Sequence, residues 1–485
     1  MYPRNVRIGI FALEGLNAFA MAMYLNYLFF IMRQTFGFEN LENLTLAATN
    51  GFVYMAGSWL GGKFGQRHGY FRALRTGFAV MALSLSAGLL VRTVAGHYCV
   101  MAAYTLGASL TWPAMEAILS EKATSERLQD MVGIYNLVWS VTSAFAVLAG
   151  GALLERAGPR GFFVIPASVN LLQFVLASLL ARTAKAALGA DRSSAPCAPA
   201  ATDPLAAAPG PGGPALRPPT PRSPVAPRTF MKMAWLANPL SYVAINSLIP
   251  VIPRIAADLD LSPALAGAVG SVWFFTRSAA FFALWRWTGW HYRFRWLLGS
   301  FVAMIVCYWV IQLVPLASHL AYAVRLAALI GAQVVFGASI GLSYYSSLFY
   351  SMDVGETKGE HGGFHEAALG SGLFVGPFLG AAALRLFPAS PASAAWAVTG
   401  LLGLGALALL LLRHLGERVD LSERQDQSKE PDPQESQRRQ RHRQQQRQRH
   451  GSAPGSRPVP QGKEKSPNDP IGPQQAQLRN RPHPP

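Results

Sequence analysis

The chain is a series of long apolar segments separated by short polar ones. Each apolar segment is unbroken for roughly 20 residues, which is the length a helix needs to cross about 30 Å of hydrocarbon. Soluble domains instead space their apolar residues with the period of a helix or a strand. The pattern therefore predicts twelve transmembrane helices, over residues 8–31, 44–62, 74–92, 96–118, 131–153, 161–182, 230–252, 263–285, 295–315, 322–350, 364–387 and 393–413.

The predicted helices fall into two groups of six, over residues 1–182 and 230–413. The stretch between them, 183–229, is dense in Pro, Ala and Gly, and 414–485 is polar and basic. Neither stretch can bury enough apolar surface to offset its ordering entropy, so we expect a disordered linker and a disordered tail. The expected fold is an all-α membrane protein of two pseudo-symmetric six-helix bundles.

Composition agrees with a membrane protein, because 51% of residues are hydrophobic and 14% are charged. Soluble chains carry nearer a quarter. The net charge of +17 lies mostly in loops and in the tail. Placing the N-terminus inside gives the inner loops most of the basic residues, which predicts that both termini and the linker are cytoplasmic, in a bacterial inner membrane. The tail has no aromatic residue for stacking on bases, so lipid headgroups, and not a specific nucleic acid, are its expected partner.

The loop after the second predicted helix has a recognisable sequence, Gly-Lys-Phe-Gly-Gln-Arg-His-Gly from Gly62 to Gly69. It resembles the loop signature of the major facilitator superfamily, a Gly followed by Asp-Arg-x-Gly. The resemblance implies two six-helix halves that transport small molecules. In that family the acid and the following Arg resemble a latch between the halves on the cytoplasmic side. Here Arg67 supplies the cation, whereas Gln66 replaces the acid, so the latch is expected to be weaker or to take its acid from elsewhere.

The eleventh predicted helix is rich in glycine. Gly372, Gly376 and Gly380 repeat every fourth residue and form a flat strip that another helix can approach closely. The strip resembles the Gly/Pro-rich helices that act as gates in the family. Ordinary close packing without gating is the alternative interpretation.

The predicted helices contain few ionisable residues in their interiors, and each is costly inside a membrane and therefore a functional candidate. Glu14 is the leading candidate for proton coupling, followed by Glu116 and Glu366. Glu116 has a second interpretation, as the partner of Arg67 in the latch. Arg277 is expected either to pair with a buried acid or to extend to the nearer interface.

Two histidines precede the eleventh helix, His361 and His365. Their spacing of four suits zinc on a continuous helix, but Gly362 and Gly363 between them argue against such a helix, so no metal site is predicted. His365 and Glu366 are instead candidates for handling a proton, with a plain helix-start role for Glu366 as the alternative.

In the family the resemblance points to, the first, fourth, seventh and tenth helices line the central cavity. Each of those segments carries a polar stripe here, at helical spacing. We predict that these stripes line the cavity, with hydrogen bonding between helices as the alternative. The predicted lining residues are Glu14, Asn17, Tyr24, Ser109, Trp112, Asn238, Tyr242, Asn246, Gln333 and Tyr344.

The sequence lacks the phosphate-binding loop of an ATP-driven pump and the motifs of common hydrolases. It therefore predicts a monomeric secondary transporter without a cofactor, which moves a small molecule by alternating access and is coupled to protons. It is not expected to be an enzyme. A transporter-like sensor or scaffold, acting through its linker and tail, is the alternative function.

The charge bias gives a testable topology. Cysteines placed at Ser194 and Ser466 should resist an impermeant thiol reagent in intact cells, because the linker and tail are expected in the cytoplasm. Full labelling in permeabilised cells is the control. Labelling of either site in intact cells would reverse the orientation.

Overall fold

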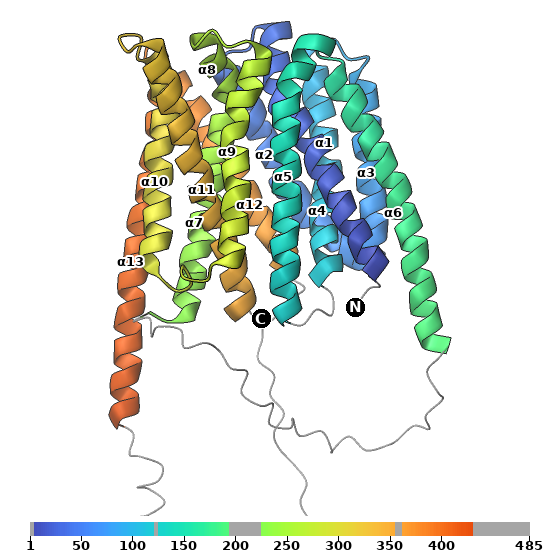
Figure 1. Ribbon diagram of the computed structural model, residues 1–485, viewed down its shortest axis with the longest axis vertical. Helices are drawn as coiled ribbons and strands as arrows, with labels where there is room; N and C mark the ends of the chain where they lie inside the picture. The colour runs from blue at the N-terminus through green and yellow to red at the C-terminus, as the bar shows by residue number, and fades with distance from the viewer. Residues whose placement is uncertain (1–3, 121–124, 194–224, 355–360, 430–485) are drawn as a thin grey trace, which may run out of the picture. The chain divides into compact units, whose positions relative to one another are not determined.

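The computed structural model describes residues 4–120, 125–193, 225–354 and 361–429, and within these ranges all regular structure is helical (Figure 1). The first half of the chain forms α1 (Arg4–Phe36), α2 (Asn40–His68), α3 (Tyr70–Gly88), α4 (Val94–Ser120), α5 (Ser125–Ala157) and α6 (Gly161–Ser193). The second half forms α7 (Pro227–Leu248), η1 (Ile249–Val251), α8 (Ile252–Asp258), α9 (Pro263–Arg286), α10 (Phe294–Leu313), η2 (Val314–Leu316), α11 (Tyr322–Val354), α12 (His361–Leu386) and α13 (Ser393–Lys429).

Nine helical segments among the described residues are long and apolar enough to cross a membrane. They lie in α1, α5, α6, α7 with α8, α9, α10 with η2, α11, α12 and α13. Exposed large apolar side chains such as Leu83, Leu171 and Leu404 lie on the outside of the bundle, where lipid would cover them. The chain is thus an integral, multi-pass membrane protein, whereas the number twelve remains a prediction.

Several helices extend beyond their predicted ends. α6 continues to Ser193 through an alanine-rich stretch with good helix propensity. α13 continues to Lys429, and an ion pair one turn apart, from Arg413 Nε to Glu417 Oε1 at 2.9 Å, supports its extension. The remaining linker and tail positions, 194–224 and 430–485, lie outside the described residues.

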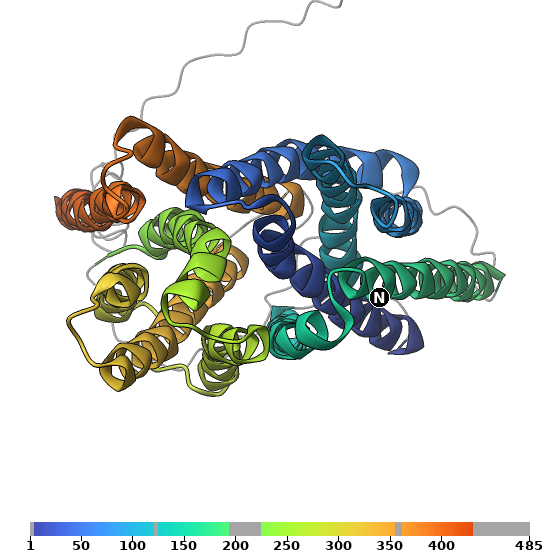
Figure 2. The ribbon, with the colours of Figure 1, turned by 90° about the horizontal axis from the view of Figure 1, so that it is seen from above.

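The two groups of helices pack in the same way. α2 contacts α4 as α9 contacts α11, α3 contacts α4 as α10 contacts α11, and α1 contacts α5 as α7 contacts α12. The halves then meet along two seams, α2 against α12 and α5 against α9 (Figure 2). Each seam joins the second helix of one half to the fifth long helix of the other, which is the pairing expected of two related six-helix units.

Glycines allow the backbones to approach closely along both seams. Gly51 on α2 faces the backbone of Leu373 on α12, and a Cβ added to Gly370 would lie 2.6 Å from Cα of Met55. On the other seam Gly151 faces the backbone of Gly267. A side chain at these positions would force the halves apart.

The predicted glycine strip on α12 serves two neighbours. Gly372 faces the backbone of α7, and a Cβ on Gly376 would lie 2.5 Å from the carbonyl oxygen of Val243 on that helix. A Cβ on Gly380 would instead lie 3.3 Å from Leu44 of α2, in the other half. The strip therefore packs α12 against its own half and also against the opposite one.

Gly51→Ala should destabilise the folded protein in detergent by about 1–3 kcal/mol, because the new methyl overpacks a backbone contact. Gly400→Ala on α13 is the matched control, since an added Cβ there meets no atom within 4 Å. Thermal unfolding followed by fluorescence measures both. Equal melting temperatures for the two variants would show that the seam can relax at no cost.

Candidate substrate and proton site

A cavity of about 210 Å³ lies between the two halves. Helices α1, α2, α4, α5, α7, α9 and α12 and the turn η1 contribute to its wall. Most of the wall is apolar, as in most small-molecule sites. Its polar and aromatic lining residues are Asn26, Phe29, Asn50, Trp112, Trp139, Ser143, Tyr242, Asn246, Trp273, Phe274 and Arg277.

Three of the predicted lining residues belong to this cavity, namely Trp112, Tyr242 and Asn246. Trp112 Nε1 donates to the sulfur of Met21 at 3.0 Å. The side-chain amide of Asn246 donates to the carbonyl oxygen of Tyr242 at 2.9 Å, which leaves its own oxygen available.

The other predicted residues do not line this cavity. Asn17 donates to Thr111 at 3.2 Å, and Ser109 donates to the carbonyl oxygen of Leu106 on its own helix at 2.8 Å. Asn17 thus makes a hydrogen bond between helices, as in the alternative interpretation of the polar stripes. Also outside the lining of this cavity are Glu14, Tyr24, Asn238, Gln333 and Tyr344.

Helices α5 and α9 also contribute to the cavity, which the sequence pattern did not predict. Trp139, Trp273 and Phe274 line the cavity, but single aromatic residues in an apolar helix look like ordinary packing residues. Asn26 and Asn50 also line it, and each is an amide inside an otherwise apolar segment. Such amides are the signal that could have identified them.

Arg277 is buried at the cavity wall, with 5% of its surface exposed. Its guanidinium carbon lies 4.5 Å from the ring centroid of Trp139, 5.0 Å from that of Trp273 and 5.1 Å from that of Phe274. Cation–π attraction to these rings partly compensates the charge. Within the described part of the chain Arg277 forms neither of the two predicted arrangements, a buried ion pair or an extension to the interface.

Two carboxyl groups meet at the α2–α12 seam. Glu366 on α12 accepts a hydrogen bond from the hydroxyl of Tyr54 on α2 at 2.5 Å. Glu116 on α4 lies beside Glu366, close enough for a hydrogen bond between the two carboxyl groups. The pair therefore contains one acid from each half.

Glu14 is the third acid of this region. It is fully buried on α1, and neither carboxyl oxygen has a hydrogen-bond partner among the described residues. The hydroxyl of Tyr135 and the carboxyl of Glu116 are its polar neighbours. Glu14 thus lies next to the carboxyl pair and not in the cavity wall.

The predicted latch residues lie away from this pair. Gln66 and Arg67 are exposed in the last turn of α2, and Glu116 packs against Glu366 instead of against Arg67. His365 falls in the first turns of α12, but its side chain lies outside the described residues.

Comparison with known proteins agrees with this architecture. The family described as Major Facilitator Superfamily matches residues 10–236. Residues 10–236, which include most of α1, α2 to α6 and the start of α7, therefore match the major facilitator superfamily. This confirms the resemblance seen in the loop from Gly62 to Gly69.

Two solved structures of transporters share the fold. One is the nucleoside transporter NupG, 12% identical, with a TM-score of 0.57 over 84% of this chain and 99% of that one. The other is the peptide transporter POT in complex with sulfate, 15% identical, with a TM-score of 0.60 over 86% of this chain and 95% of that one. No curated protein sequence matches the chain.

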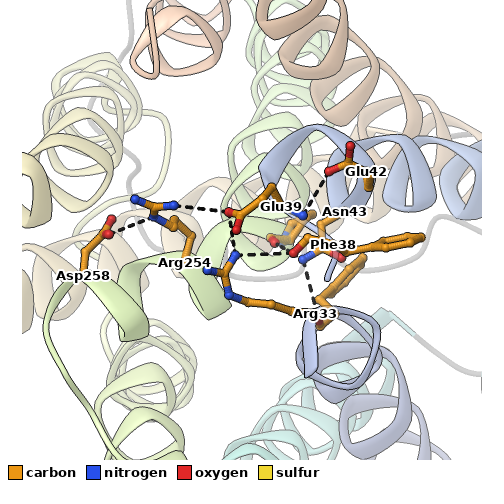
Figure 3. A network of polar contacts seen from close by, with 9 residues as sticks. Arg33, Phe38, Glu39, Glu42, Asn43, Arg254 and Asp258 are labelled. Atoms are coloured by element: carbon orange, nitrogen blue, oxygen red, sulfur yellow. Dashed lines mark hydrogen bonds and ion pairs between the residues drawn. The ribbon is translucent and has the colours of Figure 1, made fainter. Parts of the chain in front are cut away.

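This chain has a network of ion pairs at the end of the helices opposite the N-terminus (Figures 1 and 3). Glu39, between α1 and α2, accepts from Arg33 at 2.6 Å and from Arg254 of α8 at 3.3 Å. Arg254 also pairs with Asp258 at 2.8 Å. Nearby, the amide of Asn43 donates to the carbonyl oxygen of Pro250 at 3.1 Å. Glu39 and Asn43 therefore tie the first half of the chain to the second.

Partial burial acts to raise the pKa of Glu39, but hydrogen bonds and charge from Arg33 and Arg254 outweigh it, and the pKa falls below its ordinary 4.5. A lowered pKa means that the ionised form is favoured in the folded protein. The stabilisation is fully present above the ordinary pKa and is lost as the pH falls through the lowered one. The network is therefore intact at neutral and mildly acidic pH.

Glu39→Gln should loosen the contact between the two halves at this end of the helices. A cysteine at Ser143, which lines the cavity, should then react faster with a thiol reagent in purified protein whose native cysteines are replaced by serine. High salt should also speed the reaction of the protein with Glu39 intact, because salt screens exposed ion pairs.

Glu42→Gln is the matched control, since Glu42 accepts from the backbone N–H of Glu39 at 2.9 Å and caps α2 without an ion pair to α8. Identical labelling rates for both variants would mean that the ion network does not limit access to the cavity from this end.

Proposed function

We propose that the chain is a proton-coupled secondary transporter, not an enzyme, which moves a small molecule by alternating access across the cytoplasmic (inner) membrane of a bacterium. All twelve long helices would span the membrane, with both termini in the cytoplasm. The carboxyl pair of Glu116 and Glu366 is the observation that carries the proposal, since its acids come from opposite halves.

Two adjacent carboxyl groups in a low-dielectric interior cannot both ionise without a large cost. The pair of Glu116 and Glu366 is therefore expected to hold a proton while the α2–α12 seam is closed. Tyr54 donates to Glu366 and would keep that carboxyl in place. Opening the seam would separate the acids and admit water, so that the proton could leave.

Glu14 fits a second position on the same proton route. Its unpartnered carboxyl lies beside Glu116 and Tyr135, within the first half. A proton released by the pair could pass to Glu14 through these groups or through water. Rocking of the halves would then change which acid holds the proton, which ties proton movement to the transport cycle.

The two solved neighbours are a nucleoside transporter and a peptide transporter. We therefore propose a small polar metabolite as the class of substrate. The cavity between the halves and its amide groups suit such a molecule. The alternative, a sensor or scaffold that does not transport, has no specific observation in its favour. Uptake into vesicles separates the two.

Glu366→Gln and Glu116→Gln should each abolish accumulation driven by a proton gradient while still permitting counterflow exchange, because exchange needs no net proton movement. The expected loss is the whole roughly fifty-fold accumulation that one charge can drive through about 100 mV. Purified protein in vesicles, with a substrate found by ligand screening, gives both measurements.

Asp260→Asn is the control, because Asp260 is exposed and has a positive φ of 47°, a conformation that Asn adopts readily. Wild-type accumulation by both glutamine variants would remove the pair from the coupling mechanism. Loss of exchange together with accumulation, in folded protein, would assign the pair to substrate binding instead.

A further inference from the structure

The wall of the cavity contains donors that lack acceptors. Arg277 Nε and Trp273 Nε1 are both buried and have no hydrogen-bond partner in the described part of the chain. Both residues line the same cavity. A buried donor without a hydrogen-bond partner destabilises the protein, and a ligand that accepts a hydrogen bond from it would remove part of that cost.

Arg277 also brings an uncompensated charge. Among the described residues its ionisable neighbours are the hydroxyl groups of Tyr242 and Tyr344, not carboxylates. Tyr242 lies between Arg277 and the carboxyl groups around Glu366. The acids of the proton site therefore do not neutralise Arg277 directly, and the three aromatic rings around it supply attraction without a counter-charge.

We propose that Arg277 binds the anionic group of the transported substrate, so that this transporter carries a small organic anion. This inference rests on the proposed transport function. A carboxylate or phosphate group matches the planar guanidinium fork, which can donate two parallel hydrogen bonds to it. The indole N–H of Trp273 supplies a further donor for the same group.

The amides of the cavity define the rest of the substrate. Asn26 and Asn246 each donate from their amide nitrogen to a backbone carbonyl of their own helix, at 2.7 and 2.9 Å, which leaves their oxygens as acceptors. Asn50 accepts from Thr105 at 2.5 Å and keeps its amide hydrogens to donate. The acceptors suit hydroxyl or amino groups, so the expected substrate is a hydroxylated or amino organic acid.

Arg277 also has a purely structural interpretation, because it lies on α9 and stacks on Trp139 of α5 across the seam. A cation that only joins the two helices would give melting temperatures that do not depend on added anions. The substrate interpretation requires that the response to an anion disappears with the guanidinium. The two interpretations are therefore separable by binding measurements on folded protein.

The test compares anions with their uncharged analogues on purified protein, at equal ionic strength and millimolar concentration. Lactate is paired with lactamide, mandelate with mandelamide, and glycerophosphate with glycerol. At least one anion should raise the melting temperature of the wild type while its analogue does not. Arg277→Gln should weaken that binding about tenfold or more, because it removes a charged partner, and Arg277→Lys should retain part of it.

Arg286→Gln is the matched control, because it removes an exposed positive charge at the end of the same helix. It should respond to anions as the wild type does. Three outcomes would overturn the inference: an equal anion response in folded Arg277→Gln, a response to uncharged analogues only, or no anion response by the wild type. If Arg277→Gln does not fold, binding by Arg277→Lys tests the inference instead. Affinities of Arg277→Lys for the anion and for its analogue that equal those of the wild type would contradict a guanidinium site.

Vesicle uptake distinguishes failure of the inference from failure of transport. Accumulation of an uncharged solute, equal in the wild type and in Arg277→Lys, would leave the transport function standing and exclude the anion. Anion binding that depends on Arg277, without uptake of the bound anion into vesicles, would leave the site standing and contradict transport.

Discussion

A charge inside a membrane must be compensated, and this constraint governs where every ionisable group of the chain lies. Nearly all of the basic residues fall in loops, helix ends or the tail. Among the described residues, the acids Glu14, Glu116 and Glu366 and the cation Arg277 enter the bundle, and they meet the cost in three ways. Glu116 and Glu366 adjoin each other, Glu14 lies beside them without a partner, and Arg277 is surrounded by aromatic rings.

At the seams, the packing of the two halves is coupled to the environment of a buried carboxyl group. Backbone approach at Gly51 and Gly151 brings the halves together without intervening side chains. The same approach places Tyr54 of one half within 2.5 Å of Glu366 of the other. Movement along the seam would therefore break a hydrogen bond to a carboxyl group, so the packing of the halves and the state of the acid cannot change independently.

The sequence predicts the helices and the family but only part of the site. Each predicted apolar segment overlaps a long helix of the described residues, because the thickness of hydrocarbon sets the length of such segments. The cost of charge identifies Glu366 and Arg277 without knowledge of their partners. A polar stripe shows which residues share a helix face, but not whether that face contacts the cavity or other protein groups. Asn17 and Ser109 are examples, since both hydrogen-bond to protein groups. Trp139 and Trp273 stay unrecognised because an aromatic residue looks the same in a lipid-facing, packed or ligand-binding position.

The proposed proton and anion sites complement each other electrically. An anion that enters alone would move negative charge through the membrane, whereas an anion that moves with one proton would carry no net charge. Tyr242 lines the cavity and neighbours both Arg277 and Glu366, so it lies where the two sites meet. Binding of the anion at Arg277 would add negative charge near the carboxyl groups and favour the protonated pair. By linkage, protonation would favour binding of the anion to the same degree, which would make the two bind together.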